Sequence, residues 1–191
     1  LSRDRLILLV AQKDAEVDRQ PIPPTELLKD ARRQIREIFE KDYTQAKSDP
    51  SKAVLAKKLL EQALKDDSDP VAYFALLREA RDLAADGNGW DTVCEVVDAM
   101  GEKFEVNAWE MKEELLSAAV KVSRSANAQE RLCEAMLDVL NAAVEAQQFD
   151  IARKLVSSLT TASGRVQGAT GNVPYRRRFQ LSAAELKKLE P

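Results

Sequence analysis

The sequence predicts a soluble, all-α protein built as an antiparallel array of helical hairpins, and three observations support this prediction. Only 6 glycines occur among 191 residues and aromatic residues make up 5%, a composition poor in the residues that strands and turns favour. Apolar residues recur at three- and four-residue steps over most of the chain. No polar–apolar alternation rich in β-branched residues lasts for the length of a strand. We expect about seven main helices and a short C-terminal helix, arranged as a short α-solenoid or an irregular helix bundle.

Prolines near the start of the chain predict its first division. Pro21, Pro23 and Pro24 favour a rigid, extended connector, because proline fixes its own backbone and restricts the residue before it. We therefore expect an N-terminal helical segment over residues 1–20 and the main array over residues 21–164. The chain begins without methionine, and we expect it to be part of a longer polypeptide.

The first half of the array contains sequence signals for the starts and ends of helices. Asp49-Pro50 and Asp69-Pro70 each predict an N-cap followed by proline at the first helical position. Gly87-Asn88-Gly89 predicts a tight turn. The three helices between these signals are expected to follow three apolar stripes: Leu27, Leu28, Ala31, Ile35, Ile38, Phe39 and Tyr43; Val54, Leu55, Leu59, Leu60 and Ala63; and Val71, Phe74, Leu77, Ala80 and Ala84.

Four more helices are expected in the second half. Asn107 with Glu110, and Asn127 with Glu130, have the spacing of a capping box. The expected stripes are Trp90, Val93, Val97, Met100 and Phe104; Met111, Leu115, Ala119 and Val122; Leu132, Met136, Val139 and Ala143; and Ala152, Leu155, Val156 and Leu159. The last helix is expected to run from Phe149 to about Ser163, because the glycines at 164, 168 and 171 disfavour helix.

The C-terminal segment, residues 165–191, is predicted to form a loop and a short docked helix opened by a capping box of Ser182 and Glu185. The candidate site in this loop is Tyr175, Arg176, Arg177, Arg178 and Phe179. Three guanidinium groups between two aromatic rings are able to bind phosphate or carboxylate groups. The alternative, which we favour, is that the two rings pack on the last hairpin while the arginines pair with acidic helix faces.

Two segments 59 residues apart, 83–100 and 142–159, share a helix end, a polar turn, an aromatic-Asp pair and an amphipathic helix. The turn over residues 145–152 resembles that of tetratricopeptide repeats, which implies stacked helical hairpins. The regular 34-residue period of that family is absent. The segments 56–60 and 76–85 also resemble helical regions of large uncharacterised planctomycete proteins, which implies no activity. A divergent repeat and an irregular bundle therefore both remain open.

Composition argues against several kinds of chemistry. The chain contains no histidine, which removes the usual general base and the common catalytic triads. The carboxylate pairs Glu113-Glu114 and Asp66-Asp67 are expected to be solvated surface charges. Asp86 and Asp91 flank the glycine turn, either as turn and cap residues or as oxygen ligands of a cation. Cys94 and Cys133 are expected to be buried free thiols, with a disulfide or reactive pair as the alternative. We predict no catalytic residue, no cofactor and no metal.

These patterns favour a non-catalytic scaffold, spacer or protein-interaction module with a protein partner. The net charge of −3 provides no field for nucleic acid, and no apolar run is long enough to cross a membrane. The first alternative is a small-molecule-binding or enzyme-accessory helical domain, in which Trp90 and Trp109 line a ligand groove instead of anchoring the core. The third is weak nucleic-acid binding through Arg176, Arg177 and Arg178. Neither the cellular compartment nor the oligomeric state follows from the sequence.

Overall fold

The computed structural model describes residues 19–123 and 125–170, and in these residues the predicted all-α fold is confirmed. They contain eight helices and no β-strand; residues 1–18 of the predicted N-terminal helical segment lie outside them. The helices are α2 (Thr25–Ile38), α3 (Glu40–Gln45), α4 (Asp49–Lys65), α5 (Pro70–Asp86), α6 (Trp90–Lys103), α7 (Ala108–Val122), α8 (Ala126–Glu145) and α9 (Phe149–Thr170).

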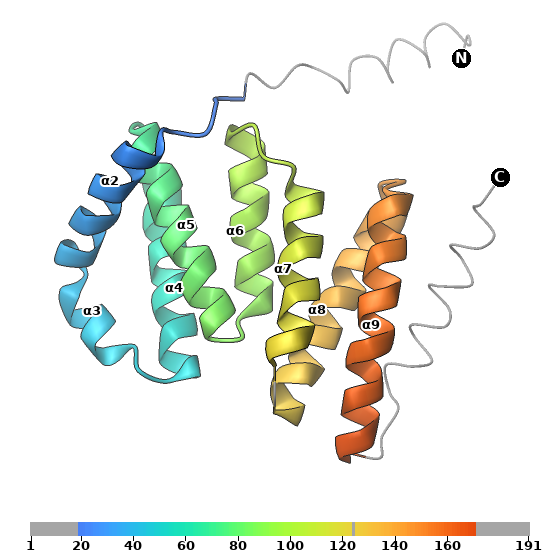
Figure 1. The fold of residues 1–191 in the computed structure, drawn as a ribbon. Helices are drawn as coiled ribbons and strands as arrows, with labels where there is room; N and C mark the ends of the chain where they lie inside the picture. Colours follow the sequence, from blue (N-terminus) through green and yellow to red (C-terminus); the bar gives the residue numbers. More distant parts are fainter. Residues whose placement is uncertain (1–18, 124, 171–191) are drawn as a thin grey trace, which may run out of the picture.

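The helices form an array in which α2 and α3 stand at one end and α9 at the other (Figure 1). Short connections make consecutive long helices pack against one another from α4 to α9. Contacts also link α4 to α6 and α6 to α8 in one layer, and α2 to α5 and α7 to α9 in the other. The short α3 packs against α4. The described chain is therefore a two-layered, elongated array.

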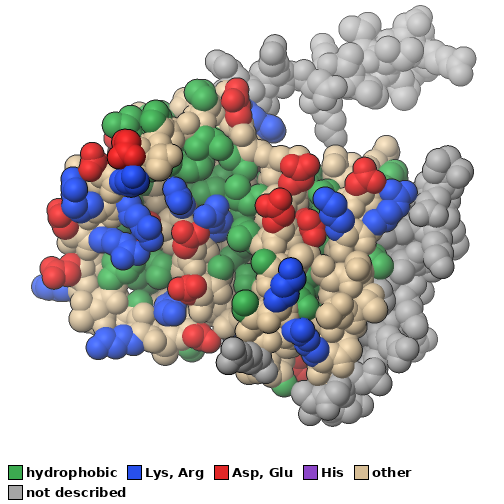
Figure 2. All heavy atoms as spheres, in the orientation of Figure 1, with side chains coloured by type: hydrophobic (Ala, Val, Ile, Leu, Met, Phe, Trp, Pro, Cys, Tyr) green, Lys and Arg blue, Asp and Glu red, His purple; other side chains and the backbone are tan. Residues whose placement is uncertain are grey.

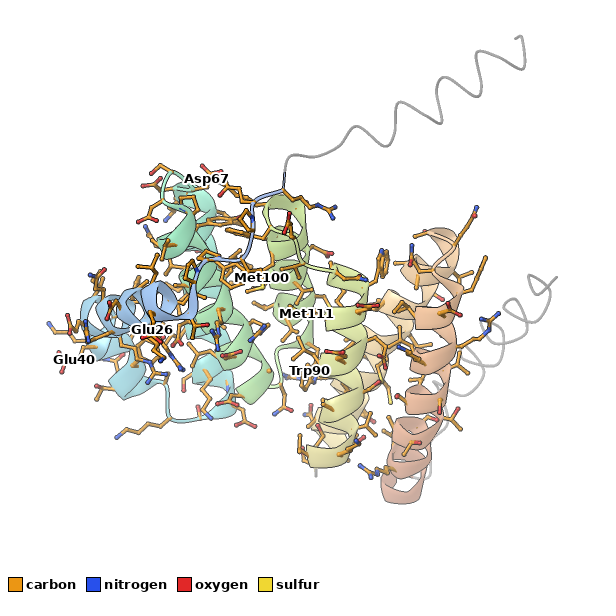
Figure 3. All side chains as sticks on the ribbon, turned by 45° about the horizontal axis from the view of Figure 1, so that its top comes forward. Glu26, Glu40, Asp67, Trp90, Met100 and Met111 are labelled. Carbon is orange, nitrogen blue, oxygen red and sulfur yellow. The ribbon has the colours of Figure 1, made fainter. Side chains whose placement is uncertain are left out.

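Its apolar interior is divided into two clusters. One lies mainly among α2, α4, α5 and the second half of α6, and the other among α6, α7, α8 and α9. Two partly buried side chains, Leu83 and Met111, pack against both clusters. Figure 3 labels Met111 on α7 and the fully buried Met100 on α6.

The two segments that match in sequence form the same turn. Asn88 and Gln147 are the two non-glycine residues with positive φ in the described residues, at 55° and 58°. The amides of Gly89 and Gln148 donate to the carbonyls of Ala84 and Ala143, at 2.8 and 2.7 Å. Asn88 and Gln147 themselves donate three residues back, to Ala85 and Val144. This is the Schellman pattern at both helix ends, and every donor and acceptor is offset by 59 residues.

The proline connector is extended, as predicted, and it is tied to the array. The amide of Gln20 donates to the carbonyl of Lys103, and the amide of Glu105 donates to the carbonyl of Gln20, both at 2.9 Å. Pro23 is buried. The residues before α2 therefore lie against the loop between α6 and α7.

The capping predictions are partly confirmed. Asp69 is the N-cap of α5, and its carboxylate accepts from the amides of Val71 and Ala72. Asn107 caps α7 by accepting from the amide of Glu110 at 3.2 Å. The other two predictions are wrong by one or two residues, because a serine hydroxyl upstream supplies the cap. Ser48 caps α4, so that Asp49 is its first residue, and Ser125 caps α8 in place of Asn127.

Most residues of the predicted stripes are buried and several are half-buried, while four near helix ends or at the edge of the array are exposed. Those four exposed residues are Leu27, Ile38, Val54 and Val122. The first predicted helix is also broken in two: α2 ends at Ile38, and Phe39, with φ −101° and ψ 20°, separates it from α3. The break allows α3 to turn towards α4, where the Nζ of Lys58 lies 2.8 Å from both carboxylate oxygens of Asp42.

The predicted end of the last helix is too early. Helix α9 continues through Gly164 and Gly168 to Thr170, so the boundary at residue 164 does not end the array. Ala162 and Val166 extend the buried stripe of Leu155 and Leu159, and this packing outweighs the cost of about 1 kcal/mol for each glycine. Among the described helices, none is long and apolar enough to cross a membrane.

Candidate interaction surface on helices α2, α3 and α5

The site predicted from the sequence, Tyr175, Arg176, Arg177, Arg178 and Phe179, lies outside the described residues, as does the capping box of Ser182 and Glu185. Both interpretations of this segment stay predictions. The most developed charged site in the described residues lies on α2, α3 and α5, at the α2 end of the array (Figure 1).

This site is built on a buried carboxylate. Glu79 projects from α5 and is only 3% exposed. Its Oε1 is ion-paired with the Nε of Arg32, and its Oε2 accepts from the Nε of Arg36 at 3.3 Å. The hydroxyl of Tyr43, from α3, donates to Oε2 at 2.7 Å. Both oxygens of the carboxylate are therefore occupied, as burial of a charge requires.

The two arginines are held in a particular orientation. Both meet Glu79 through Nε, and none of the contacts described for either guanidinium uses its η nitrogens. The guanidinium carbon of Arg36 also lies 5.2 Å from the centroid of the Tyr43 ring. About half of each arginine side chain is exposed. Arginine binds carboxylates and phosphates through its guanidinium group, so two half-exposed guanidinium groups held on a buried carboxylate are suited to binding an anion.

Beside this cluster lies an open hollow of about 620 Å³, which we call the α2 groove. Its lining residues are Lys29, Arg32, Arg33, Arg36, Glu37 and Glu40. A smaller hollow of about 170 Å³ shares Lys29 and Arg32 with it and adds Arg78. Figure 2 shows the basic side chains gathered over α2 and α3, and the labelled Glu26 and Glu40 of Figure 3 mark the starts of these two helices. The groove is predominantly basic.

Two exposed ion pairs flank the groove on α2 itself. Lys29 pairs with Glu26 and Arg33 pairs with Asp30, each at 2.8 Å and each three residues apart. Exposed pairs of this kind contribute only about 0–1 kcal/mol, so an incoming anion is able to replace them. The Tyr43 hydroxyl stays protonated, because burial and the adjacent Glu79 raise its pKa above the ordinary value. The chemistry of the site is anion binding through hydrogen bonds and charge.

A separate hollow, of about 410 Å³, lies beside the α5–α6 turn. Its lining residues include Asp49, Asp86, Asn88, Trp90 and Ser123. Trp90 is 5% exposed, which confirms it as a core residue. However, its Nε1 has no hydrogen-bond acceptor in the described residues, and the Oγ of Ser123 also has no partner there. We call this space the Trp90 hollow.

Trp109, the other tryptophan, is only half-buried. The Nζ of Lys112 lies 5.3 Å from the centroid of its ring and 2.6 Å from Oδ1 of Asp98. Trp109 packs at the edge of the core and also lines an open hollow of about 660 Å³ with Arg19, Asp98 and Glu102. Trp109 therefore packs against the core and also lines a surface hollow.

One expectation about carboxylates is wrong. Glu113 is buried, not solvated, and its Oε1 accepts from the hydroxyl of Ser117 at 2.7 Å. Ser117 in turn lies 2.7 Å from the hydroxyl of Ser158 on α9. Asp66 and Asp67 are exposed, as predicted, and hydrogen bonds from Ser68 and Lys103 respectively lower their pKa.

The described residues contain no group of three or more His, Cys, Asp or Glu side chains placed to bind a metal ion. Asp86 lies 3.8 Å from the ammonium group of Lys52 instead. Cys94 and Cys133 are both free, so no disulfide joins them. Burial raises the pKa of Cys94 to about 11 and that of Cys133 to about 12, so neither thiol ionises appreciably at neutral pH.

Sequence reasoning missed the Glu79 cluster. Residues 36, 43 and 79 come from three separate helices, and the apolar stripe of α5 is complete without Glu79. One signal was available: Lys29, Arg32, Arg33 and Arg36 follow each other at one-, three- and four-residue steps on one side of a helix. Such a basic stripe is also compatible with a solvated face.

No known protein-family model matches the chain, and no curated protein is significantly similar to it.

Proposed function

We propose that this chain is a non-catalytic helical scaffold for protein–protein interaction, and that the α2 groove is part of its partner-binding surface. The observation that supports this most directly is the pair Arg32 and Arg36, which contact buried Glu79 through Nε while about half of each arginine side chain is exposed. Donors fixed before binding lose less conformational entropy when a partner arrives.

The architecture supports the same proposal. A two-layered array with a divided core offers a long surface, as helical repeat proteins do. The two equivalent turns at Asn88 and Gln147 favour an origin in repeated hairpins. The charged cluster lies beside an open hollow on the surface at the end of the array.

Site-specific photocrosslinking tests the proposal in an extract of the source organism. A photoreactive amino acid replaces Arg33 in the groove, Glu61 on α4 or Lys154 on α9, each of which is exposed. We expect one protein to crosslink from position 33 in preference to the other two. The capture must work in reverse, from the tagged partner, and must be lost when Lys29→Glu is added. Equal labelling from all three positions, or none, would contradict the proposal.

The Trp90 hollow favours a second candidate function, small-molecule binding. The buried indole N–H and the Ser123 hydroxyl are unused polar groups of the kind that a ligand satisfies. A library of small polar compounds, screened by thermal shift, is the test. Stabilisation of the wild-type protein that Trp90→Phe abolishes would support this function, because phenylalanine keeps an aromatic ring at this position and removes the N–H. Stabilisation that survives Trp90→Phe would place the ligand elsewhere.

A further inference from the structure

We infer that the α2 groove recognises an acidic, carboxylate-bearing segment of a partner protein, and that Arg32 and Arg36 each bind one of its carboxylates. This inference rests on the proposed function and names the chemistry of the partner at that surface.

Charge balance favours carboxylates over phosphates. Glu79 carries one negative charge and contacts two positive ones, so the cluster of Glu79, Arg32 and Arg36 has one positive charge to spare. Lys29 and Arg33 add two more, which Glu26 and Asp30 already offset at the surface. Glu37 and Glu40 also line the groove. The lining residues and Glu79 together carry four positive and three negative charges, an excess of one. Lys29 and Arg33 become available to a partner when it displaces Glu26 and Asp30 from their exposed pairs. Singly charged carboxylates suit this small excess better than doubly charged phosphates.

The spacing of the donors suggests the form of the partner. Arg32 and Arg36 are four residues apart on α2, which corresponds to about 6 Å along the helix axis. Two carboxylates one helical turn apart on a partner segment have the same spacing. The groove volume of about 620 Å³ and its open form allow such a segment to lie along α2 instead of inserting end-on.

The binding probe is a fluorescent peptide, acetyl-AEAAAEAAAEAA-amide, titrated with the full chain by fluorescence anisotropy. A second peptide has glutamine in place of every glutamate, a third has phosphoserine, and a single-stranded oligonucleotide is the fourth probe. We expect the glutamate peptide to bind at least roughly tenfold more tightly than the glutamine peptide, the loss expected when one charge-assisted hydrogen bond is removed. Its affinity should also fall between 50 and 200 mM salt.

Matched variants locate the binding. Lys29→Glu with Arg33→Glu reverses two groove charges without touching Glu79, and should weaken the glutamate peptide at least roughly tenfold. Lys121→Glu with Lys154→Glu makes the same change in net charge on α7 and α9 and should leave the affinity within about twofold. Arg32→Gln, Arg36→Gln and Glu79→Gln together remove the donors without leaving the buried carboxylate unpaired, and should abolish binding while the circular dichroism spectrum is retained.

Several results would overturn the inference. These are equal affinity for the glutamate and glutamine peptides, unchanged binding in the Lys29→Glu/Arg33→Glu variant, or tighter binding of the phosphoserine peptide or the oligonucleotide at 200 mM salt. If the peptides fail while photocrosslinking finds a partner at the groove, the carboxylate inference is wrong and the proposed function stands. If both experiments fail, the proposed function is wrong as well.

Discussion

The hydroxyl of Tyr43 and the Oε2 of Glu79 are 2.7 Å apart, and this hydrogen bond joins α3 to α5 across the end of the array. The same oxygen accepts from Arg36. Because Tyr43 and Arg36 approach one oxygen from either side of the break at Phe39, the bend between α2 and α3 is coupled to the orientation of the guanidinium. The charged groove is therefore a product of the tertiary fold and not only of the basic stripe on α2.

Alkaline pH should weaken this link. Burial and the neighbouring carboxylate raise the pKa of Tyr43 in the folded chain, so folding opposes its ionisation. Its contribution to stability is complete below the unfolded-state pKa of about 10 and is lost as pH rises from there towards the folded-state value. The free energy of unfolding should fall more steeply above pH 10 in the wild type than in Tyr43→Phe. Parallel curves would show that Tyr43 ionises as easily in the folded chain as in the unfolded one.

The aromatic packing in the first core cluster gives a second prediction. Phe74 is buried and meets the Phe104 ring edge-on, with the centroids 4.8 Å apart. Phe74→Ala should cost about 3–5 kcal/mol in urea unfolding, the usual range for a buried phenylalanine. Ile38→Ala is the control, because Ile38 is 76% exposed and should lose less than about 0.5 kcal/mol. A loss below about 1 kcal/mol for Phe74→Ala would contradict the assigned core.

Apolar periodicity predicted the fold class and most of the core, but it did not identify the polar residues that share the core. On α7 the predicted stripe ran through Met111, Leu115 and Val122, whereas the buried face includes Lys112 and Glu113. A buried charge looks like a surface charge in sequence, because its partners belong to other helices. For the same reason Glu79 was not predicted, and the α2 groove with it.

The Asp-Pro pairs did not by themselves fix the first residue of each helix, because neighbouring side chains decide which residue is the N-cap. Asp69 is an N-cap and Asp49 is not, although each precedes a proline, because Ser48 forms a reciprocal capping box with Ser51. Proline is tolerated throughout the first turn of a helix, so it does not fix the first residue. The turn after α5 was predicted correctly, because the end of one apolar stripe, the Gly87-Asn88-Gly89 turn and the start of the next stripe at Trp90 all indicate the same boundary.

Both cysteines should react more slowly than an exposed thiol, and Cys133 should react more slowly than Cys94. Cys133 is buried and Cys94 is half-buried, and burial raises the pKa of both, to about 12 and about 11. At pH 7.5 a thiol-reactive reagent should label Cys94 slowly and Cys133 more slowly still, with both reacting fast in 8 M urea. The Cys94→Ala and Cys133→Ala variants assign the two rates. Rapid labelling of Cys133 in native buffer would mean that α8 opens readily.

The last prediction compares two glycines: Gly87, in the predicted tight turn, and Gly164, which was predicted to end the last helix. A Cβ at position 87 would lie 2.6 Å from the carbonyl oxygen of Asp49 and 2.8 Å from the amide nitrogen of Ala53, so the turn after α5 touches the backbone at the start of α4. Because backbone atoms are the obstacle, Gly87→Ala should destabilise the chain by about 1–3 kcal/mol, the usual cost of overpacking.

Gly164 is the matched control. A Cβ at that position would meet nothing within 4 Å, and the residue lies inside α9. Gly164→Ala should therefore stabilise the chain by about 0.5–1 kcal/mol, since alanine loses less backbone entropy in a helix. If α9 is continuous and α4 approaches the turn this closely, urea unfolding should show that the two variants change the free energy of unfolding in opposite directions. Destabilisation by Gly164→Ala would indicate that the helix ends before residue 164, and a neutral Gly87→Ala would indicate that α4 is able to move away from the turn.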